Sequence, residues 1–458
     1  MPWAIWEKIT ALSSWITARL NPNKQQITHH AHSTINKLNT GHWTFVKRQF
    51  IFPLRFLLPE YVLEKGWNIV CKSFGPMESI GDPIINTRWF LTTVKIPLRF
   101  QRAEFGMLLV TTSWGSLVGL RFLSLKALDL GPGWQAPSYA DTDSDARECE
   151  ITLGQGRRFK VGATLCLPST TQKEPETKSK SFKFPCIIFL GGSGPLDRDS
   201  TVEENKPFKD LALGLASHGI ASIRFDKVTF THRKAFARRK DVTLTDEYVE
   251  HATDAVLQAQ MHPSICADSI YILGHSLDAV VAPRIACMDG VAGCILMAGP
   301  AEPIYRCYVR QLRYIESLDG PESLYLGKQI DDAEVRAEVA DGEELTMATP
   351  AKKLPFGIGA AYWLDYRRFE PIRTTGCLGK PVAVFQGERD YQVTVEDDYG
   401  VWWEALRGKE GVKFYLYEGL NHLFVYGTGM STPLEYSVPG NVDKRVVDDI
   451  ARWVFGNK

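Results

Sequence analysis

The sequence carries no excess charge of either sign. Lysine and arginine together number 53, aspartate and glutamate also number 53, and the formal net charge at pH 7 is +0. No overall field therefore attracts nucleic acid or an anionic membrane, and we expect neither as a partner. The main local basic run extends from His232 to Lys240. Such a run is typical of a solvated loop, with contact to a phosphate or coenzyme A as the alternative.

Metal-binding and disulfide patterns are also lacking. The nine cysteines are an odd number without Cys-x-x-Cys spacing, which argues against a disulfide framework and against a zinc site. Three histidines, at 29, 30 and 32, have no acidic residue or cysteine nearby at ligand spacing and indicate a solvated helix face. We therefore expect no metal and no other cofactor, and a reducing compartment such as the cytoplasm.

No run approaches the roughly 20 apolar residues that span a bilayer. Glu7 and Lys8 interrupt the apolar start, so a secretory signal is not expected. Residues 1–23 nevertheless place apolar side chains at the spacing of an amphipathic helix. These are Ile5, Ile9, Leu12, Ile16 and Leu20. We expect this helix to dock on the protein or across a homodimer; membrane contact is less favoured because the segment has few cations.

The chain is long enough for more than one domain, with 458 residues of which 44% are hydrophobic. Helical patterns at 29–38 and 59–74 precede alternating runs at 89–97, 104–112 and 117–123. This order predicts a small α+β domain over 24–125, followed by a linker over 126–148. From 149 to 458, short apolar runs alternate with helical patterns, which predicts an α/β fold with a mostly parallel sheet.

Ser276 marks the most informative point of this second region. It lies where the apolar run beginning at Ile270 changes to the helical pattern 277–286. A strand, a sharp turn and a helix form a nucleophile elbow, which exposes a hydroxyl beside the N–H groups at a helix N-terminus. Asp390 and His422 follow, each after a further apolar run. The order Ser, acid, His is that of a nucleophilic triad in α/β-hydrolases.

These motifs resemble the α/β-hydrolase superfamily over about residues 145–458. Gly191-Gly192-Ser193-Gly194-Pro195, after the strand 186–190, looks like the oxyanion loop of a bacterial-type branch. The resemblance implies that the N–H groups of Leu277 and Ser193, with Gly194 second, hold the oxyanion. The chain is also similar, in pattern and position, to members of the superfamily that carry a small cone-like N-terminal domain, and to hydrolases of fungal polyketide biosynthesis.

Asp278 departs from the Gly-x-Ser-x-Gly pattern, because it replaces the second glycine. We expect an aspartate to cost steric strain at a crowded elbow while the nucleophile stays ordinary. The alternative is that Asp278 modulates Ser276 or its pocket away from simple hydrolysis.

A helical cap is predicted over about 301–375, where a bare hydrolase fold needs only one helix. Tyr362 and Trp363 lie in it and either line a substrate pocket or form the core of the cap. The sequence thus predicts a serine hydrolase, an esterase or thioesterase, acting on a bulky and mostly apolar small-molecule substrate. The alternatives are a non-hydrolytic biosynthetic enzyme on the same scaffold and a non-catalytic binding protein.

Overall fold

The structure is a computed structural model that describes residues 24–140, 146–169, 183–321 and 323–457. The amphipathic helix predicted at 1–23 and the acidic end of the linker lie outside the described residues. Two compact units can be distinguished. One contains residues 1–133, 315–324 and 432–439, and the other contains 134–314, 325–431 and 440–458.

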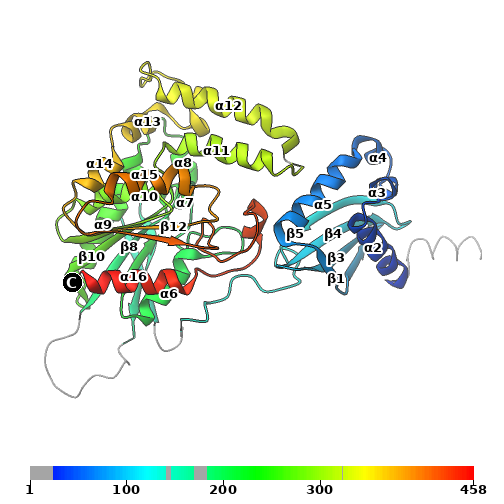
Figure 1. The fold of residues 1–458 in the computed structure, drawn as a ribbon, viewed down its shortest axis with the longest axis horizontal. Coiled ribbons are helices and arrows are strands. Elements are labelled where there is room, and N and C mark those ends of the chain that lie inside the picture. The colour runs from blue at the N-terminus through cyan, green and yellow to red at the C-terminus, as the bar shows by residue number, and fades with distance from the viewer. Residues whose placement is uncertain (1–23, 141–145, 170–182, 322, 458) are drawn as a thin grey trace, which may run out of the picture. The chain divides into compact units, whose positions relative to one another are not determined.

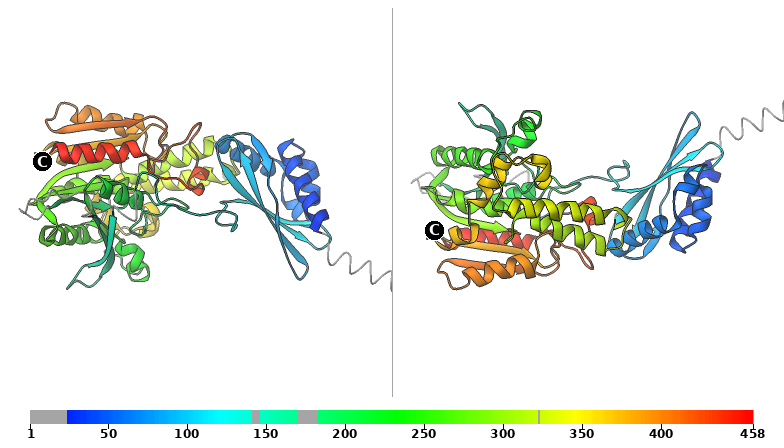
Figure 2. Two further views of the ribbon diagram at one scale, coloured as in Figure 1. Left: turned by 90° about the horizontal axis from the view of Figure 1, so that it is seen from below. Right: turned by 90° about the horizontal axis from the view of Figure 1, so that it is seen from above.

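The first unit is an antiparallel sheet with helices on one face (Figure 2). The helices are α2 (Lys24–Asn39), α3 (Trp43–Gln49), α4 (Leu54–Leu57) and α5 (Glu60–Phe74). The strands are β1 (Met77–Ile80), β2 (Ile84–Arg88), β3 (Leu91–Phe100), β4 (Glu104–Thr112) and β5 (Leu117–Leu123). Along β3 every second side chain is buried, as the alternating sequence predicts, and Phe100 packs on Trp67 and Phe74 of α5.

The second unit contains an eight-stranded sheet in the order β13-β12-β11-β10-β8-β9-β7-β6. Its strands are β6 (Ala146–Leu153), β7 (Val161–Pro168), β8 (Phe184–Leu190), β9 (Ala221–Phe225), β10 (Ile265–His275), β11 (Val291–Met297), β12 (Val382–Gly387) and β13 (Val412–Tyr417). All pairs from β9 to β13 are parallel, whereas β7 pairs antiparallel with both β6 and β9. The predicted mostly parallel α/β fold is confirmed.

Helices cover both faces of this sheet (Figure 1). α6 (Pro207–Ser217) and α16 (Lys444–Gly456) pack on one face, where residues such as Phe208 and Trp453 join one buried cluster. α9 (Glu250–Met261), α10 (Leu277–Ala286) and α15 (Gly400–Leu406) pack on the other. Because both faces are covered, the central strands are continuous apolar runs rather than alternating ones.

Shorter elements and the cap complete the second unit. Before the cap stand α7 (Val228–Thr231), α8 (Arg233–Phe236) and the π-helical turn η1 (Thr245–Val249). The inserted region contains α11 (Ile304–Ser317), α12 (Ser323–Asp341), η2 (Ala351–Lys353), η3 (Pro355–Gly357), α13 (Ala360–Arg367) and α14 (Pro371–Gly376). The π-helical turn η4 (Val395–Tyr399) and η5 (Pro433–Ser437) follow. None of the helices in the described ranges is long and apolar enough to cross a membrane.

The two units group residues by contact and not by order along the chain. Residues 315–324 and 432–439 fall within the predicted range 149–458, yet their contacts group them with the first unit. The Lys65 ammonium lies 2.6 Å from the Asp319 carboxylate, and the Ser73 and Thr432 hydroxyls are 2.7 Å apart. Such contacts join residues far apart in sequence, and no local pattern reveals them.

Candidate active site

Ser276 occupies a strained turn between β10 and α10. Its backbone has φ 56° and ψ −128°, a conformation that is uncommon for any residue but glycine. The turn is held by the Ser276 N–H, which donates to the Met297 carbonyl at 2.9 Å. A side chain at Gly274 would begin 2.2 Å from the Asp278 carbonyl oxygen, so only glycine fits at that position.

Asp390 and His422 are brought together beside the ends of β12 and β13. The Asp390 Oδ2 lies 2.7 Å from His422 Nδ1, and both side chains are buried. The Asp390 Oδ1 accepts hydrogen bonds from the N–H groups of Gln392 and Val393 at 2.8 and 3.0 Å. These bonds stabilise an ionised carboxylate, which keeps the proton of His422 on Nδ1 and leaves its Nε2 as an acceptor.

His275 contacts His422 but does not line the cavity. Its Nε2 donates to the His422 carbonyl at 2.8 Å, and the two rings lie 4.7 Å apart between centroids. Burial, assisted by the neighbouring His422, lowers the pKa of His275 to about 3. His275 is therefore neutral at physiological pH and acts as a fixed hydrogen-bond donor.

The predicted oxyanion donors lie around Ser276. Leu277 is the first residue of α10, so its N–H has no carbonyl partner within the helix. Ser193 and Gly194 line the same cavity as Ser276 and Leu277. A side chain at Gly192 would begin 3.2 Å from the Ser276 Cβ, which shows how closely the loop approaches the elbow.

A buried charged cluster lies behind this loop. The Lys227 ammonium donates to the Gly192 carbonyl at 2.8 Å and forms an ion pair with Glu247 at 3.2 Å. It also donates to the Tyr248 hydroxyl at 2.5 Å. The Tyr362 hydroxyl donates to the other Glu247 oxygen at 3.0 Å. Sequence analysis missed this cluster; the available signal was Lys227, two residues after the end of the buried strand β9, where a cation needs a partner.

Asp278 also belongs to this buried region. Its side chain is fully buried; among the described residues its carboxylate has the Tyr248 hydroxyl nearby, but this contact does not reach good hydrogen-bond geometry. Burial raises the pKa of Asp278 well above its usual value, and the nearby Lys227 only partly opposes this. Lys227 is already paired with Glu247, so a neutral, protonated Asp278 is the form that suits this site.

The steric strain expected at Asp278 is not found. Asp278 is an ordinary helical residue of α10 and is not among the described residues with positive φ. The close approach of the elbow falls on Gly274 instead, because the missing Cβ of that residue faces the Asp278 backbone. Asp278 does not line the cavity beside Ser276 either.

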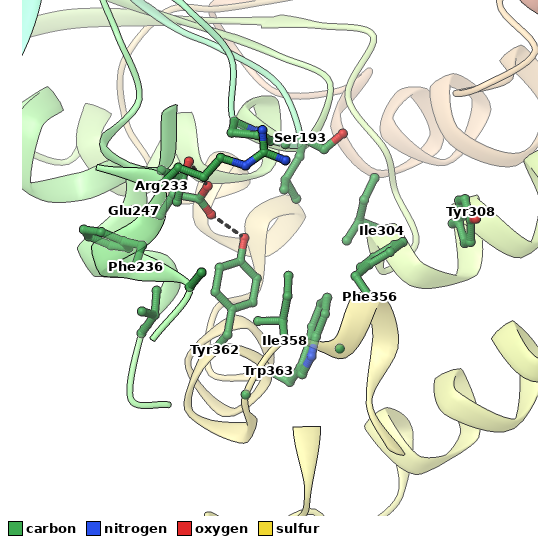
Figure 3. A pocket seen from close by; sticks show the side chains of 18 of the residues that line it. Ser193, Arg233, Phe236, Glu247, Ile304, Tyr308, Phe356, Ile358, Tyr362 and Trp363 are labelled. Atoms are coloured by element: carbon green, nitrogen blue, oxygen red, sulfur yellow. Dashed lines mark hydrogen bonds between the residues drawn. The ribbon is translucent and has the colours of Figure 1, made fainter. Parts of the chain in front are cut away.

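A cavity of about 660 Å³ opens beside Ser276 (Figure 3). Its apolar walls come from both the hydrolase core and the cap. They include Phe236, Val242, Ile304, Tyr308, Phe356, Ile358 and Trp363. Tyr362 and Trp363 both line it, and the buried indole N–H of Trp363 has no acceptor among the described residues. The cavity suits a bulky apolar group with a few polar contacts.

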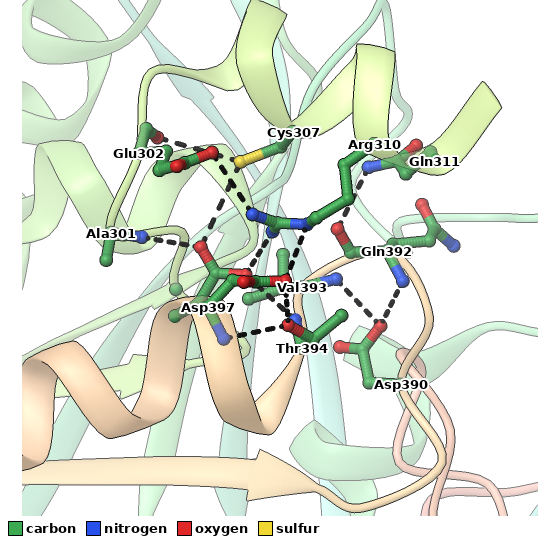
Figure 4. A network of polar contacts seen from close by, with 12 residues as sticks. Ala301, Glu302, Cys307, Arg310, Gln311, Asp390, Gln392, Val393, Thr394 and Asp397 are labelled. Carbon is green, nitrogen blue, oxygen red and sulfur yellow. Dashed lines mark hydrogen bonds and ion pairs between the residues drawn. The ribbon is translucent and has the colours of Figure 1, made fainter. Parts of the chain in front are cut away.

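The cap is tied to the loop that carries Asp390 (Figure 4). Asp398, fully buried in η4, forms an ion pair with Arg310 of α11. It also accepts hydrogen bonds from the N–H groups of Ala301 and Thr394, at 2.9 and 2.8 Å. Gln311 of α11 donates to the Gln392 carbonyl at 3.2 Å. The cap helix therefore positions the turn whose N–H groups hold Asp390. Nothing in the sequence pattern identified Arg310 or Asp398.

No group of three or more metal-ligating side chains occurs within the described ranges. The structure holds a serine on a strained elbow that lines a cavity, and a buried pair of Asp390 and His422. Such a site in an eight-stranded, mostly parallel sheet defines a hydrolase of the α/β class.

Comparison with known proteins agrees with this assignment. No protein-family model matches the sequence. Esterase EstD of Thermotoga maritima is 33% identical over 357 residues, which are 78% of this chain and 78% of EstD. This chain therefore belongs to the α/β-hydrolase superfamily and is an esterase-type hydrolase.

Solved structures of other hydrolases are similar at lower identity. Est1E from Butyrivibrio proteoclasticus has a TM-score of 0.41 and 16% identity, over 67% of this chain and 98% of its own. The α/β hydrolase GrgF from Penicillium has a TM-score of 0.37 and 18% identity, over 61% of this chain and 91% of its own.

Proposed function

We propose that this protein hydrolyses a bulky, mostly apolar acyl ester or thioester through a triad of Ser276, His422 and Asp390. The observation that carries the proposal is the position of Ser276. It lies on a strained elbow, opens into a large and mainly apolar cavity, and is followed in sequence by the buried Asp390–His422 pair.

Acylation would begin with attack by the Ser276 hydroxyl on the ester carbonyl carbon. His422 Nε2 accepts the hydroxyl proton, and Asp390 stabilises the imidazolium through Nδ1. The negative charge that forms on the carbonyl oxygen is held by the N–H groups of Leu277 and Ser193, with Gly194 as a further donor. His422 then returns the proton to the departing alcohol or thiol, which leaves an acyl group on Ser276.

Deacylation would repeat these steps with water. His422 removes a proton from the water molecule as its oxygen attacks the acyl carbon, and the same N–H groups hold the second oxyanion. Collapse of this intermediate releases the carboxylic acid and returns the proton to Ser276. No metal or organic cofactor enters either step.

The cavity supports a large apolar substrate. It accommodates more than a short acyl chain, and Phe236, Ile358 and Trp363 provide apolar contact surface from opposite walls. The resemblance to fungal biosynthetic hydrolases makes a polyketide-derived acyl ester one substrate of this kind.

Labelling with a fluorophosphonate probe tests the proposal, because such probes react with an activated serine. The wild-type protein should be labelled and should hydrolyse a series of p-nitrophenyl esters. Ser276→Ala should abolish both. Ser193→Ala is the matched control: it removes the other serine hydroxyl of the cavity lining but keeps the backbone N–H, so it should still be labelled. Equal labelling of Ser276→Ala and wild type would refute the assignment.

A further inference from the structure

One wall of the Ser276 cavity is basic. Arg233 on α8, followed by Arg239 and Lys240 in the next loop, all line the cavity. Sequence analysis interpreted the run 232–240 as a solvated loop. Arg233 and Lys240 are solvent-exposed, as that interpretation expects, and the structure also places them and Arg239 beside a cavity whose other walls are largely apolar.

Two of these three cations have no counterion among the residues that the structure describes. Arg239 pairs with Asp241 at 3.1 Å and with Asp246 at 3.5 Å. Within the described part of the chain, the Arg233 and Lys240 side chains make no ion pair or hydrogen bond. Unpaired cations beside an apolar, low-dielectric wall give this side of the cavity a positive potential.

The acidic residue of the cavity lining does not offset this potential. Glu247 is already neutralised by Lys227 at 3.2 Å, and its oxygens also accept hydrogen bonds from Thr229 and Tyr362 at 2.9 and 3.0 Å. Arg233 and Lys240 are therefore the cations of the cavity lining that have no direct partner among the described residues, although Asp241 and Asp246 together exceed the charge of Arg239 by one.

We infer that Arg233 and Lys240 form a subsite for an anionic group, a carboxylate or a phosphate, carried by the substrate away from the ester bond. The inference rests on the proposed function and makes the substrate amphiphilic. Figure 3 shows the Arg233 side chain extending into the pocket on the side of Ser193. A guanidinium binds planar oxyanions through two parallel hydrogen bonds, and Lys240 adds a second charge. An entirely apolar substrate would gain nothing from either cation.

Three matched p-nitrophenyl esters test this subsite. They share one acyl chain and differ only at its far end, which is a methyl ester, a carboxylate or a phosphate. The measured quantity is the ratio of kcat/KM for each anionic ester to that for the neutral one. In the wild type we expect a ratio of about 10–100, the range of a charge-assisted hydrogen bond. The ratio should fall as salt is added, because the site is open to solvent.

Arg233→Gln and Lys240→Gln should each lower this ratio, by about tenfold for Arg233, mainly through KM. Lys234→Gln and Arg238→Gln are the matched controls, since they remove cations of the same segment that do not line the cavity. Their ratios should stay within about twofold of the wild-type ratio. The larger ratio of the two anionic esters identifies carboxylate or phosphate as the preferred group.

A wild-type ratio near one, or an equal loss in Lys234→Gln and Arg233→Gln, would overturn the inference. Calorimetric titration of Ser276→Ala with the same esters separates this outcome from failure of the proposed function. Arg233-dependent preference for the anionic ester in binding, without turnover by the wild type, would support the subsite and refute the triad. Turnover that depends on Ser276 but shows no preference for the anionic esters would support the triad and refute the subsite.

Discussion

The Lys227 ammonium donates a 2.8 Å hydrogen bond to the carbonyl of Gly192 and pairs with Glu247 at 3.2 Å on its other side. Glu247 lines the cavity, and Gly192 precedes the predicted oxyanion donor Ser193. One buried side chain therefore joins the cavity wall to the loop that approaches Ser276. This arrangement separates two roles of Lys227, neutralising Glu247 and positioning the loop.

Lys227→Met should impair both roles. It leaves the Glu247 charge buried without a partner, which typically costs about 3–5 kcal/mol of unfolding free energy. It also removes the hydrogen bond to Gly192, so kcat should fall by about 10–100-fold if the loop shifts away from the developing oxyanion. Denaturant unfolding and ester hydrolysis measure the two effects.

The double variant Lys227→Met/Glu247→Leu distinguishes the two roles. Removing both charges should restore most of the stability, because an apolar pair of similar volume often replaces a buried ion pair without loss. The low kcat should persist, since the Gly192 carbonyl still lacks its donor. A double variant with wild-type kcat would show that Lys227 does not position the loop.

His275→Gln should change the pH dependence of stability. The pKa of His275 is lowered to about 3 in the folded protein, from its usual value of 6.5. Between these values the unfolded chain binds a proton that the folded one does not, so His275 lowers stability as the pH falls below 6.5. Glutamine can still donate to the His422 carbonyl but does not titrate.

The difference in unfolding free energy between His275→Gln and wild type should therefore move in favour of the variant from pH 7 to pH 4.5, at up to about 1.4 kcal/mol per pH unit. Urea unfolding at several pH values measures it. A constant difference across this range would mean that His275 is not held neutral in the folded protein.

Arg310→Met should destabilise the protein and lower its activity together. It leaves Asp398 buried without its cation, a loss of about 3–5 kcal/mol, and it loosens the turn whose N–H groups hold Asp390. Arg313→Gln on the same helix is the control. Its ion pair with Glu334 is largely exposed, so it should cost no more than about 1 kcal/mol. Similar losses in both variants would contradict the role assigned to Arg310.

The fold was largely predictable because the central strands are short apolar runs separated by helical patterns. The helix expected at 277–286 begins and ends where the structure has it, and the strand expected at 186–190 is β8, which begins at Phe184 and ends at Leu190. The two short strands β1 and β2, and the helices α3 and α4, were missed. They are brief elements with little periodicity, and the burial pattern of β2 shows almost no apolar face.

The site was predictable only where chemistry depends on local sequence. The elbow at Ser276 and the order of Asp390 and His422 are visible in a linear sequence, and the structure places the last two within hydrogen-bonding distance. The cluster of Lys227, Glu247 and Asp278 is not visible, because its members are separated along the chain. The strain predicted at Asp278 was wrong because the sequence could not show that the close approach at the elbow falls on Gly274.

Asp278→Asn tests whether Asp278 is protonated, and therefore neutral, in the folded protein. Burial raises the pKa of Asp278 well above its usual value of 3.8, so above pH 3.8 the folded protein holds a proton that the unfolded chain has released. The contribution of Asp278 to stability therefore decreases as the pH rises, until the pH reaches the pKa of Asp278 in the folded protein.

Asparagine has nearly the same shape as aspartate and no proton to bind, so it removes this cost. The variant should be more stable than wild type at pH 8, and its advantage should shrink toward pH 5. Thermal unfolding at both pH values measures the change. Asp278→Gly should lose stability, because it leaves a void and puts glycine inside a helix, at a cost of about 1 kcal/mol for the backbone alone. An Asn variant with an advantage independent of pH would show that Asp278 is not protonated in the folded protein.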